Sequence, residues 1–474
     1  MRLGVVRGVS YGLFGPPTEF GPQARALGAG LVRAYVYWGQ VEPHPGEYTW
    51  DTVDALMRQL HGDEEVWITV VSSSRWATRT PTDFLPPSPA RDAAAYGEFI
   101  RRLVHRCGGR VRMWQCDNEP SNIGLTWAGT ASEYVTQLRA MHAAVRDADR
   151  RAEVVLGGCG YDVLSSPPGS PQRQFFDEVC RTGRDAFDLF SVNLYGDPHR
   201  VPGDIAQARA IAGEDTEIVV GEHGGPMLFE FPAVEAALHQ VMTTATLDTQ
   251  DTDELRARMD QETPERRAMQ ALYARMPELP AELRMLMAGC APALEARRHR
   301  IAARQLVMRT LLALSCGVRR TAYWCLAPEV PGTPDHLQMM HLLTGKLALL
   351  DYEGTTLGVR HPAADTFALL AAQLAGATRV TRLDAPDQPE LFAFRIERPA
   401  RGPLLVLWQR RDTFSGEDEP PATATWPWDG GAEAVDAFGD RHEVTVGGGH
   451  LRLAVGATPV LISQSGDATS SART

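Results

Sequence analysis

The chain is poor in lysine and carries no excess of positive charge. Lys346 is the only lysine among 474 residues, and 47 Lys and Arg residues stand against 59 Asp and Glu residues, for a formal net charge of -12. A protein that holds nucleic acid or an anionic membrane surface needs a basic face to contact phosphates. The composition therefore argues against nucleic acid and membrane as partners.

Long apolar runs are also absent. No stretch approaches the roughly 18 to 20 apolar residues that a membrane-spanning helix needs. The N-terminal sequence MRLGVVRGVSYG lacks the long apolar segment of a secretory signal. We therefore expect a soluble, cytoplasmic protein.

Motifs that bind metals or nucleotides are missing as well. The seven cysteines are scattered without a CxxC pair, and an odd number cannot close entirely into internal disulfides. Several lie in apolar runs, such as Cys325 in AYWCLA, where a small hydrophobic residue is the usual explanation. The histidines form no i, i+4 pair beside an acid, and neither GxxxxGK[ST] nor a strand-linked GxGxxG occurs. We expect free thiols, no metal site and no cofactor.

Short apolar runs of β-rich composition recur up to about residue 326, with helical patterns between them. This is the rhythm of parallel βαβ units, and near-continuous apolar runs are typical of strands buried on both faces. Eight such units predict an α/β fold with a closed (β/α)8 barrel, the TIM barrel. The expected strands cover residues 3–10, 31–38, 66–74, 110–117, 153–160, 187–195, 217–222 and 319–326.

The spacing between the seventh and eighth expected strands is too long for a crossover helix alone. We predict a helical insertion at 231–300, inside a catalytic barrel domain that spans residues 1–365. Two interpretations remain open for it. The insertion either packs on the flank of the barrel or covers the active face as a lid, because loops at strand ends border that face.

The composition changes after the barrel. A helix is expected at 361–376, and short apolar runs separated by Gly, Pro and Asp turns then predict a small antiparallel, β-sandwich-like domain at 366–464. The small polar residues of 465–474 predict a disordered tail. The expected β runs cover 391–397, 403–409, 422–428, 442–449, 450–455 and 458–464.

Two glutamates stand at the ends of expected strands. Glu119 follows the fourth strand, beside Asn118 and ahead of Pro120. Glu222 ends the seventh strand, and the glycines around it let the backbone turn sharply. The carboxyl ends of all strands of a parallel barrel meet at one rim, which is where catalytic side chains lie. We therefore predict two carboxyl groups that face one cavity.

A pair of carboxyl groups in one cavity suits the cleavage of glycosides. One group protonates the leaving oxygen as an acid, and the other meets the oxocarbenium-like centre as a carboxylate. Mutual repulsion raises the pKa of one group, which stays protonated while the other stays ionised. A separation of about 5 Å leads to retention of anomeric configuration, whereas about 7 to 9 Å leaves room for water and leads to inversion.

The ends of the fourth and seventh strands resemble those of the clan A glycoside hydrolases, whose signature is Asn-Glu-Pro at strand four and a second Glu at strand seven. Within that clan, residues 114–158 are most similar to the family 39 enzymes, which include β-xylosidases and related endo- and exo-glycosidases. Residues 32–57 resemble the clan's strand-two segment, in which an Arg and a Trp precede a Glu-Pro and a Gly-x-Tyr turn. The resemblance covers about residues 3–326 and the trailing β domain, and the insertion after strand seven is not part of it.

The resemblance implies a role for each matching residue at these strand ends. Glu119 is implied to be the acid/base, and Glu222 the nucleophile that forms a covalent glycosyl-enzyme. Asn118 is implied to hydrogen-bond the sugar 2-hydroxyl, and Arg33 matches the clan's arginine near the nucleophile.

Three further residues complete the substrate site that the resemblance implies. Tyr195 matches the strand-six tyrosine of the clan's His-x-Tyr pattern. Asn193 stands where that pattern usually has histidine, which implies altered hydrogen bonding around the nucleophile. Trp324, at the end of strand eight, matches an aromatic platform under the sugar.

Some of these side chains also fit a purely structural role. Arg33 can brace the barrel interior, and Trp324 can belong to the core. Trp38 and Trp127 are further candidates for sugar platforms, although tryptophan frequently packs in the core or at a rim instead.

The leading hypothesis is a retaining glycoside hydrolase that cleaves a β-glycosidic bond of a small or oligomeric glycoside by double displacement. A transglycosidase on the same fold, in which an acceptor outcompetes water, is one alternative. A non-catalytic carbohydrate-binding barrel is another, and two mutually repelling carboxylates speak against it. No pattern in the sequence predicts the sugar, the aglycone or the oligomeric state.

Overall fold

A computed structural model gives the fold and describes residues 1–8, 11–12, 20–227, 230–231, 270–271, 273–328 and 345–465. Eight parallel strands close into a barrel in the order of the sequence, and β8 pairs with β1. The predicted (β/α)8 barrel is confirmed. Its strands are β1 (Arg2–Val6), β2 (Leu31–Tyr37), β3 (Glu65–Val71), β4 (Met113–Cys116), β5 (Glu153–Cys159), β6 (Leu189–Leu194), β7 (Glu217–His223) and β8 (Arg320–Trp324).

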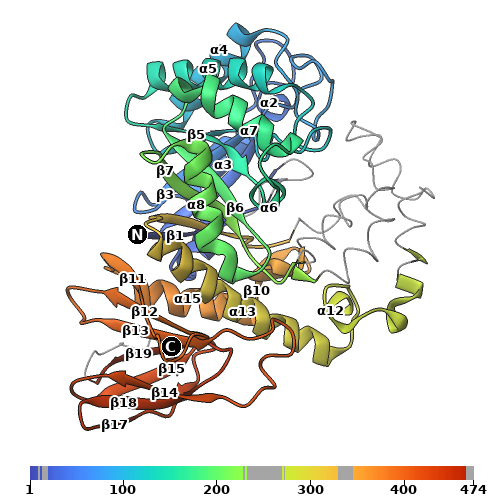
Figure 1. Ribbon diagram of the computed structural model, residues 1–474. Helices are drawn as coiled ribbons and strands as arrows, with labels where there is room; N and C mark the ends of the chain where they lie inside the picture. The colour runs from blue at the N-terminus through green and yellow to red at the C-terminus, as the bar shows by residue number, and fades with distance from the viewer. Residues whose placement is uncertain are drawn as a thin grey trace.

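Helices connect the strands and surround the barrel (Figure 1). They are α1 (Gly21–Ala26), α2 (Trp38–Val41), α3 (Asp51–Gln59), α4 (Ala93–Cys107), α5 (Ala131–Ala148), α6 (Tyr161–Ser165), α7 (Pro171–Thr182), η1 (Arg184–Ala186), η2 (Pro198–Arg200), α8 (Val201–Ala212) and α13 (Pro292–Ser315). Local sequence explains several of their ends. A capping box starts α5, because Thr130 Oγ1 accepts the Glu133 backbone N–H at 3.2 Å and the Glu133 carboxylate accepts the Thr130 backbone N–H at 2.8 Å.

Alternate residues of the strands fill the barrel interior. Leu31, Tyr35 and Tyr37 of β2 belong to one inner cluster, whereas the intervening Val32 and Ala34 belong to the layer between barrel and helices. This is the two-residue period of a strand. The period therefore aims every second side chain of β2 into the barrel.

The described part of the predicted insertion is helical. The short helices η4 (Met276–Glu278) and α12 (Ala281–Arg284) precede α13, which leads to β8. Lys346, which follows β8, donates from Nζ to the Glu295 carboxylate and to the Met287 carbonyl, both at 2.6 Å. The single lysine thus joins the segment after β8 to this helical part. Residues 232–269 and 272 of the predicted insertion lie outside the described residues, as do residues 466–474 of the predicted tail.

Antiparallel sheets after the barrel form the predicted C-terminal β region. A six-stranded sheet has the order β11-β12-β13-β19-β15-β16 and a three-stranded sheet the order β14-β18-β17. One buried cluster holds Leu405 and Ile462 from the first sheet and Leu451 and Val455 from the second, so the two sheets share a core. The strands of these two sheets are β11 (Arg379–Leu383), β12 (Leu391–Glu397), β13 (Leu404–Gln409), β14 (Ala422–Pro427), β15 (Ala432–Asp436), β16 (Arg441–His442), β17 (Thr445–Gly447), β18 (His450–Val455) and β19 (Val460–Gln464). Two further strands, β9 (Leu350–Glu353) and β10 (Thr356–Arg360), form a separate two-stranded sheet.

Four of these strands, β9, β10, β11 and β15, are not predicted by the sequence patterns. They are short and carry charged or small residues, as in RVTRL of β11 and AEAVD of β15, so apolar alternation is weak in them. The expected helix at 361–376 is present as α15 (Pro362–Leu374). The predicted domain boundary between residues 365 and 366 falls inside this helix.

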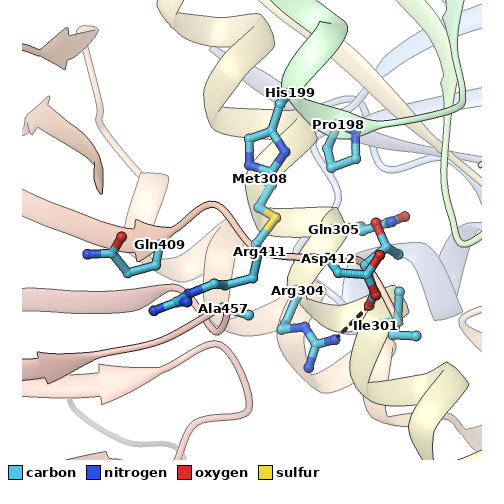
Figure 2. A pocket seen from close by; sticks show the side chains of 11 residues that line it. Pro198, His199, Ile301, Arg304, Gln305, Met308, Gln409, Arg411, Asp412 and Ala457 are labelled. Atoms are coloured by element: carbon cyan, nitrogen blue, oxygen red, sulfur yellow. Dashed lines mark hydrogen bonds between the residues drawn. The ribbon is translucent and has the colours of Figure 1, made fainter. Parts of the chain in front are cut away.

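A buried junction joins the barrel to the β sheets. Figure 1 places α13 and α15 between them. Arg304 of α13 forms an ion pair with Glu417 in the segment after β13. It also donates to the Thr413 carbonyl at 3.4 Å, and Figure 2 shows Arg304 at the edge of the junction. The Trp408 indole of β13 donates to His199 Nε2 of the barrel at 3.2 Å. A small pocket lies between these elements, and its lining includes neither predicted catalytic glutamate.

We predict that Glu417→Ala lowers the free energy of unfolding by about 2 to 4 kcal/mol, because the buried Arg304 guanidinium loses its carboxylate. Glu417 also accepts a hydrogen bond from Arg300 at 2.9 Å. The matched control is Glu419→Ala, whose ion pair with Arg411 is more exposed and whose loss should stay below about 1 kcal/mol. Chemical denaturation followed by tryptophan fluorescence measures both variants. Equal losses would contradict the prediction.

Candidate active site

The barrel brings the two predicted glutamates to one rim. Glu119 follows the end of β4, and Glu222 lies near the end of β7. The Glu222 carboxylate raises the pKa of Glu119, and the Arg33 guanidinium bonded to Glu222 lowers it. The two carboxyl groups therefore interact electrostatically.

Glu222 is surrounded by hydrogen-bond donors. Its Oε1 accepts from Tyr35 Oη at 2.8 Å, from Arg33 at 3.1 Å and from Asn118 Nδ2 at 3.3 Å. Its Oε2 accepts from Tyr195 Oη at 2.9 Å. Donors stabilise the charged form of a carboxyl group, and charged hydrogen bonds are the stronger ones. The surroundings of Glu222 thus suit a carboxylate.

The two tyrosines beside Glu222 stay protonated. Burial raises the pKa of Tyr195 well above its ordinary value, and the charge of Glu222 raises it further. Burial likewise raises the pKa of Tyr35 well above its ordinary value, with Arg33 opposing and Glu222 adding to the shift. Both hydroxyl groups therefore act as donors to the carboxylate over the physiological pH range.

Arg33 is fully buried and serves both roles that the sequence left open. Beyond Glu222, it donates to the Gly221 carbonyl at 2.7 Å and to Thr69 Oγ1 at 3.0 Å. The guanidinium carbon lies 4.9 Å from the Trp67 ring centroid, within the range of a cation–π contact. The arginine braces the barrel interior and at the same time fixes the carboxylate of Glu222.

Glu119 adopts a backbone conformation that residues with a Cβ avoid. Its φ is 47°, in the left-handed region, where a non-glycine residue costs about 1 to 3 kcal/mol. Hydrogen bonds hold it there, since its carbonyl accepts from Thr126 Oγ1 at 2.6 Å and from the Asn122 backbone N–H at 3.0 Å. Asn122 Nδ2 also donates to Glu119 Oε2 at 3.0 Å. Such strain is typical of functional sites.

Burial is the largest cause of a raised pKa at Glu119, followed by the charges of Glu222 and Asp162. The hydrogen bond from Asn193 Nδ2 to Glu119 Oε1, at 2.7 Å, and the charge of Arg33 act in the opposite direction. The causes that raise the pKa prevail, so Glu119 keeps its proton well above the ordinary carboxyl range. A protonated Glu119 beside a Glu222 that accepts hydrogen bonds from four side chains is the asymmetry that an acid and a nucleophile require.

Asn193 is placed differently from what the resemblance implies. The resemblance puts its altered hydrogen bonding around Glu222, but the structure directs its amide Nδ2 to Glu119. A register shift between β6 and β7 occurs at this point, where Asn193 becomes the cross-strand partner of Glu222. Its side chain bridges from β6 to Glu119, which follows β4.

The three tryptophans differ in their surroundings. Trp324 is buried and packs edge-on against Tyr35 at 6.4 Å, next to the donors of Glu222, and its Nε1 has no partner among the described residues. Trp38 is fully buried, stacks on Phe99 and donates to Glu42. Trp127 is fully buried as well. The structure therefore brings Trp324 to the site and packs Trp38 and Trp127 into the core.

Asp117 supports the end of β4 from behind. Its carboxyl group is fully buried and accepts from the Ser72 backbone N–H at 2.8 Å and from Gln137 Nε2 at 3.0 Å. Burial raises its pKa to about 7. With a φ of 50°, Asp117 shares the left-handed conformation of Glu119, so the turn that presents Glu119 rests on this side chain.

Sequence reasoning missed Tyr35, Asn122 and Asp162. Tyr35 follows Arg33 by two residues on one strand, so the period of a strand could have placed it on the same face. Asp162 lies after β5, and its Oδ1 and Glu119 Oε1 both stand within 3.0 Å of the position that a Cβ on Gly160 would occupy. No local pattern marks that proximity.

The described residues contain no group of three or more His, Cys, Asp or Glu arranged to hold a metal ion. Within the same ranges, no helix has the length and apolar character to cross a membrane. All seven cysteines are free, as predicted, and five of them are buried.

Comparison with known proteins finds similarity of structure alone, since no protein-family model and no curated protein sequence matches the chain. A family 39 glycoside hydrolase from Bacteroides cellulosilyticus WH2 superposes with a TM-score of 0.61 and 14% identity, over 98% of this chain and 80% of that one. A glucosidase from Croceicoccus marinus has a TM-score of 0.56 and 15% identity, over 97% and 95% of the two chains. The catalytic domain of GH30 xylanase C from Talaromyces cellulolyticus has a TM-score of 0.54 and 9% identity, over 98% and 96%. At these identities the similarity shows a shared fold over nearly the whole chain.

The raised pKa of Glu119 predicts a pH-dependent loss of stability. Above the ordinary value of 4.5 the unfolded chain releases a proton that the folded protein retains, so stability falls as pH rises through the raised pKa. Glu119→Gln removes this group. Between the ordinary and the raised pKa of Glu119, we predict that the free energy of unfolding of the variant rises relative to that of the wild type by up to about 1.4 kcal/mol per pH unit.

Unfolding measured between pH 4 and pH 9 checks this prediction. The exposed Glu178→Gln on α7 is the control, and its difference from the wild type should not change with pH. If the difference in stability between Glu119→Gln and the wild type is also independent of pH, the prediction of a raised pKa at Glu119 is wrong.

Proposed function

We propose that the chain is a retaining glycoside hydrolase that cleaves a β-glycosidic bond through a covalent glycosyl-enzyme. The observation that carries the proposal is the unequal pair of carboxyl groups. Glu222 accepts hydrogen bonds from four side chains, while burial and the neighbouring charges keep Glu119 protonated. An acid and a nucleophile are the two groups that the retaining reaction needs.

In the first step, Glu119 protonates the oxygen that joins the sugar to the leaving group. Glu222 attacks the anomeric carbon from the opposite face, so the carbon–oxygen bond to the leaving group breaks as the bond to the carboxylate forms. The leaving group departs as a neutral alcohol. Loss of its proton leaves Glu119 as a carboxylate.

In the second step, Glu119 acts as a base. It takes a proton from water while the water oxygen attacks the anomeric carbon, and Glu222 is released as a carboxylate. Two inversions at one carbon restore the original configuration. Arg33, Tyr35 and Tyr195 donate to Glu222 before and after the covalent stage, which favours its departure as an anion.

The remaining predicted residues are proposed to hold the sugar. Asn118 Nδ2 lies 3.3 Å from Glu222 Oε1, so a hydroxyl group next to the anomeric carbon is within reach of the same amide. The ring of Trp324, which packs edge-on against Tyr35, is proposed to contact the sugar. Asn193 is proposed to orient Glu119 for proton transfer.

The similar structures support a carbohydrate-active barrel without naming one substrate, because their descriptions include a glucosidase and a xylanase. A transglycosidase would use the same glycosyl-enzyme, and product analysis with an added alcohol distinguishes it from a hydrolase. We propose the barrel as the catalytic domain, in a cytoplasmic protein, and the sheets that follow α15 as a β domain that braces the barrel.

We predict that Glu119→Ala and Glu222→Ala each lower kcat on aryl β-glycosides by at least about a hundredfold, because Glu119→Ala lacks the base of the second step and Glu222→Ala lacks the nucleophile. Assays use 4-nitrophenyl β-glycosides of glucose, xylose, mannose and galactose. Azide should rescue the two variants and give glycosyl azides of opposite anomeric configuration. Wild-type rates in both variants would refute the assignment.

A second prediction concerns the pH dependence of the reaction. The negative charge of Asp162 raises the pKa of Glu119, so Asp162→Asn should lower that pKa and move the alkaline limb of kcat/KM to lower pH by about 0.5 to 1 unit. The exposed Asp185→Asn should leave the limb unchanged. An alkaline limb that stays in place or moves to higher pH in Asp162→Asn would show that the charge of Asp162 does not raise the pKa of Glu119.

A further inference from the structure

The loop that follows Glu119 exposes two large apolar side chains. Ile123 is 60% exposed and Leu125 is 45% exposed, and the described residues contain two other exposed large hydrophobic residues, Val359 and Val446. Single apolar residues on a surface are ordinary, but two on one short loop beside a strained glutamate form a local apolar surface. The segment Pro120–Ser132 contains no charged residue.

Hydrogen bonds hold this loop against Glu119. Asn122 and Thr126, which flank the two apolar residues, both bond to Glu119. The Leu125 backbone N–H donates to the Asn122 carbonyl at 3.1 Å, and the Gly124 backbone N–H donates to the Trp127 carbonyl at 2.8 Å. The exposed side chains are thus presented by a turn whose position is coupled to the acid/base glutamate.

Apolar side chains also lie on the two neighbouring loops. The backbone N–H of Ala128 donates to the Pro87 carbonyl at 2.8 Å, which joins the loop after β4 to the loop after β3. Leu85 of the β3 loop and Tyr161 after β5 are partly buried and pack against the inner cluster that includes Trp324. Because β3, β4 and β5 are adjacent in the barrel, these side chains border the end of β4 from both sides.

The position of this surface assigns it to the leaving group. Glu222 and its donors occupy the side of the site where the anomeric carbon is attacked, and Glu119 protonates the oxygen beyond that carbon. Whatever is attached to that oxygen lies toward the loop that carries Glu119.

We propose that Ile123 and Leu125 form an apolar platform for the aglycone, and that the substrates are β-glycosides with an aryl or alkyl leaving group. The proposal rests on the glycosidase function proposed above. A leaving group that is itself a sugar has several hydroxyl groups to satisfy, and Ile123 and Leu125 offer no hydrogen bonds to it. An apolar aglycone gains by covering both side chains.

The test compares substrates that share one sugar and differ in the leaving group. The sugar is chosen by screening β-glycosyl fluorides of glucose, xylose, mannose and galactose, since fluoride is too small to reach the platform. The octyl β-glycoside and the β-1,4-linked disaccharide of that sugar are then assayed with the wild type and with the double variant Ile123→Ser, Leu125→Ser. Val359→Ser is the control for loss of an equally exposed apolar residue.

The double variant should lose about tenfold in kcat/KM on the octyl glycoside, because two partly exposed apolar side chains no longer contribute burial. Its kcat/KM on the glycosyl fluoride should change less than about twofold, since the reacting groups are untouched. The wild type should prefer the octyl glycoside to the disaccharide. Both positions are exposed, so the thermal midpoint should be unchanged.

Two results would overturn the platform while leaving the glycosidase in place. One is an equal kcat/KM of wild type and double variant on the octyl glycoside, and the other is a wild-type preference for the disaccharide. Failure to hydrolyse any of the glycosyl fluorides would instead refute the glycosidase function, and the platform with it.

Discussion

The ion pair between Arg33 and Glu222 is the contact on which the barrel interior depends. The arginine side chain has no exposed surface and that of Glu222 is 7% exposed, so neither charge has water to replace its partner. Removing one member of such a pair typically costs about 3 to 5 kcal/mol. Arg33 comes from β2 and Glu222 from β7, and a bond from Arg33 to Thr69 of β3 adds a third strand. The same arginine therefore connects three strands of the barrel and fixes the position of the Glu222 carboxylate.

This arrangement also makes the two carboxyl groups unequal. The donors converge on Glu222, whereas Glu119 has an amide on each oxygen and the charges of Glu222 and Asp162 nearby. A glutamate in the left-handed region, kept protonated by its surroundings, is an unfavourable element that survives because the rest of the rim is rigid. The folded protein is less stable because of the conformation and burial of Glu119, and the same features keep an acid beside a carboxylate.

The β sheets are connected to this centre through one short loop. Tyr195, at the start of the loop after β6, donates to Glu222, and four residues later His199 accepts the indole of Trp408. Between them, the buried Arg309 of α13 donates to the carbonyl of Gly196. A short series of hydrogen bonds along this loop therefore links the β sheets to Glu222.

The sequence by itself determined the eight barrel strands, the antiparallel strands of high apolar content and the location of Glu119 and Glu222 at strand ends, because these features depend on local periodicity and on the direction of parallel strands. Only the tertiary structure decided that Asn193 donates to Glu119, that Asp162 joins the site, and that Trp38 and Trp127 are core. Those contacts join residues far apart in the chain, and they depend on a register shift between β6 and β7 and on which strand faces which across the barrel. Closure of the barrel brings these residues together, and no local pattern of residues encodes their contacts.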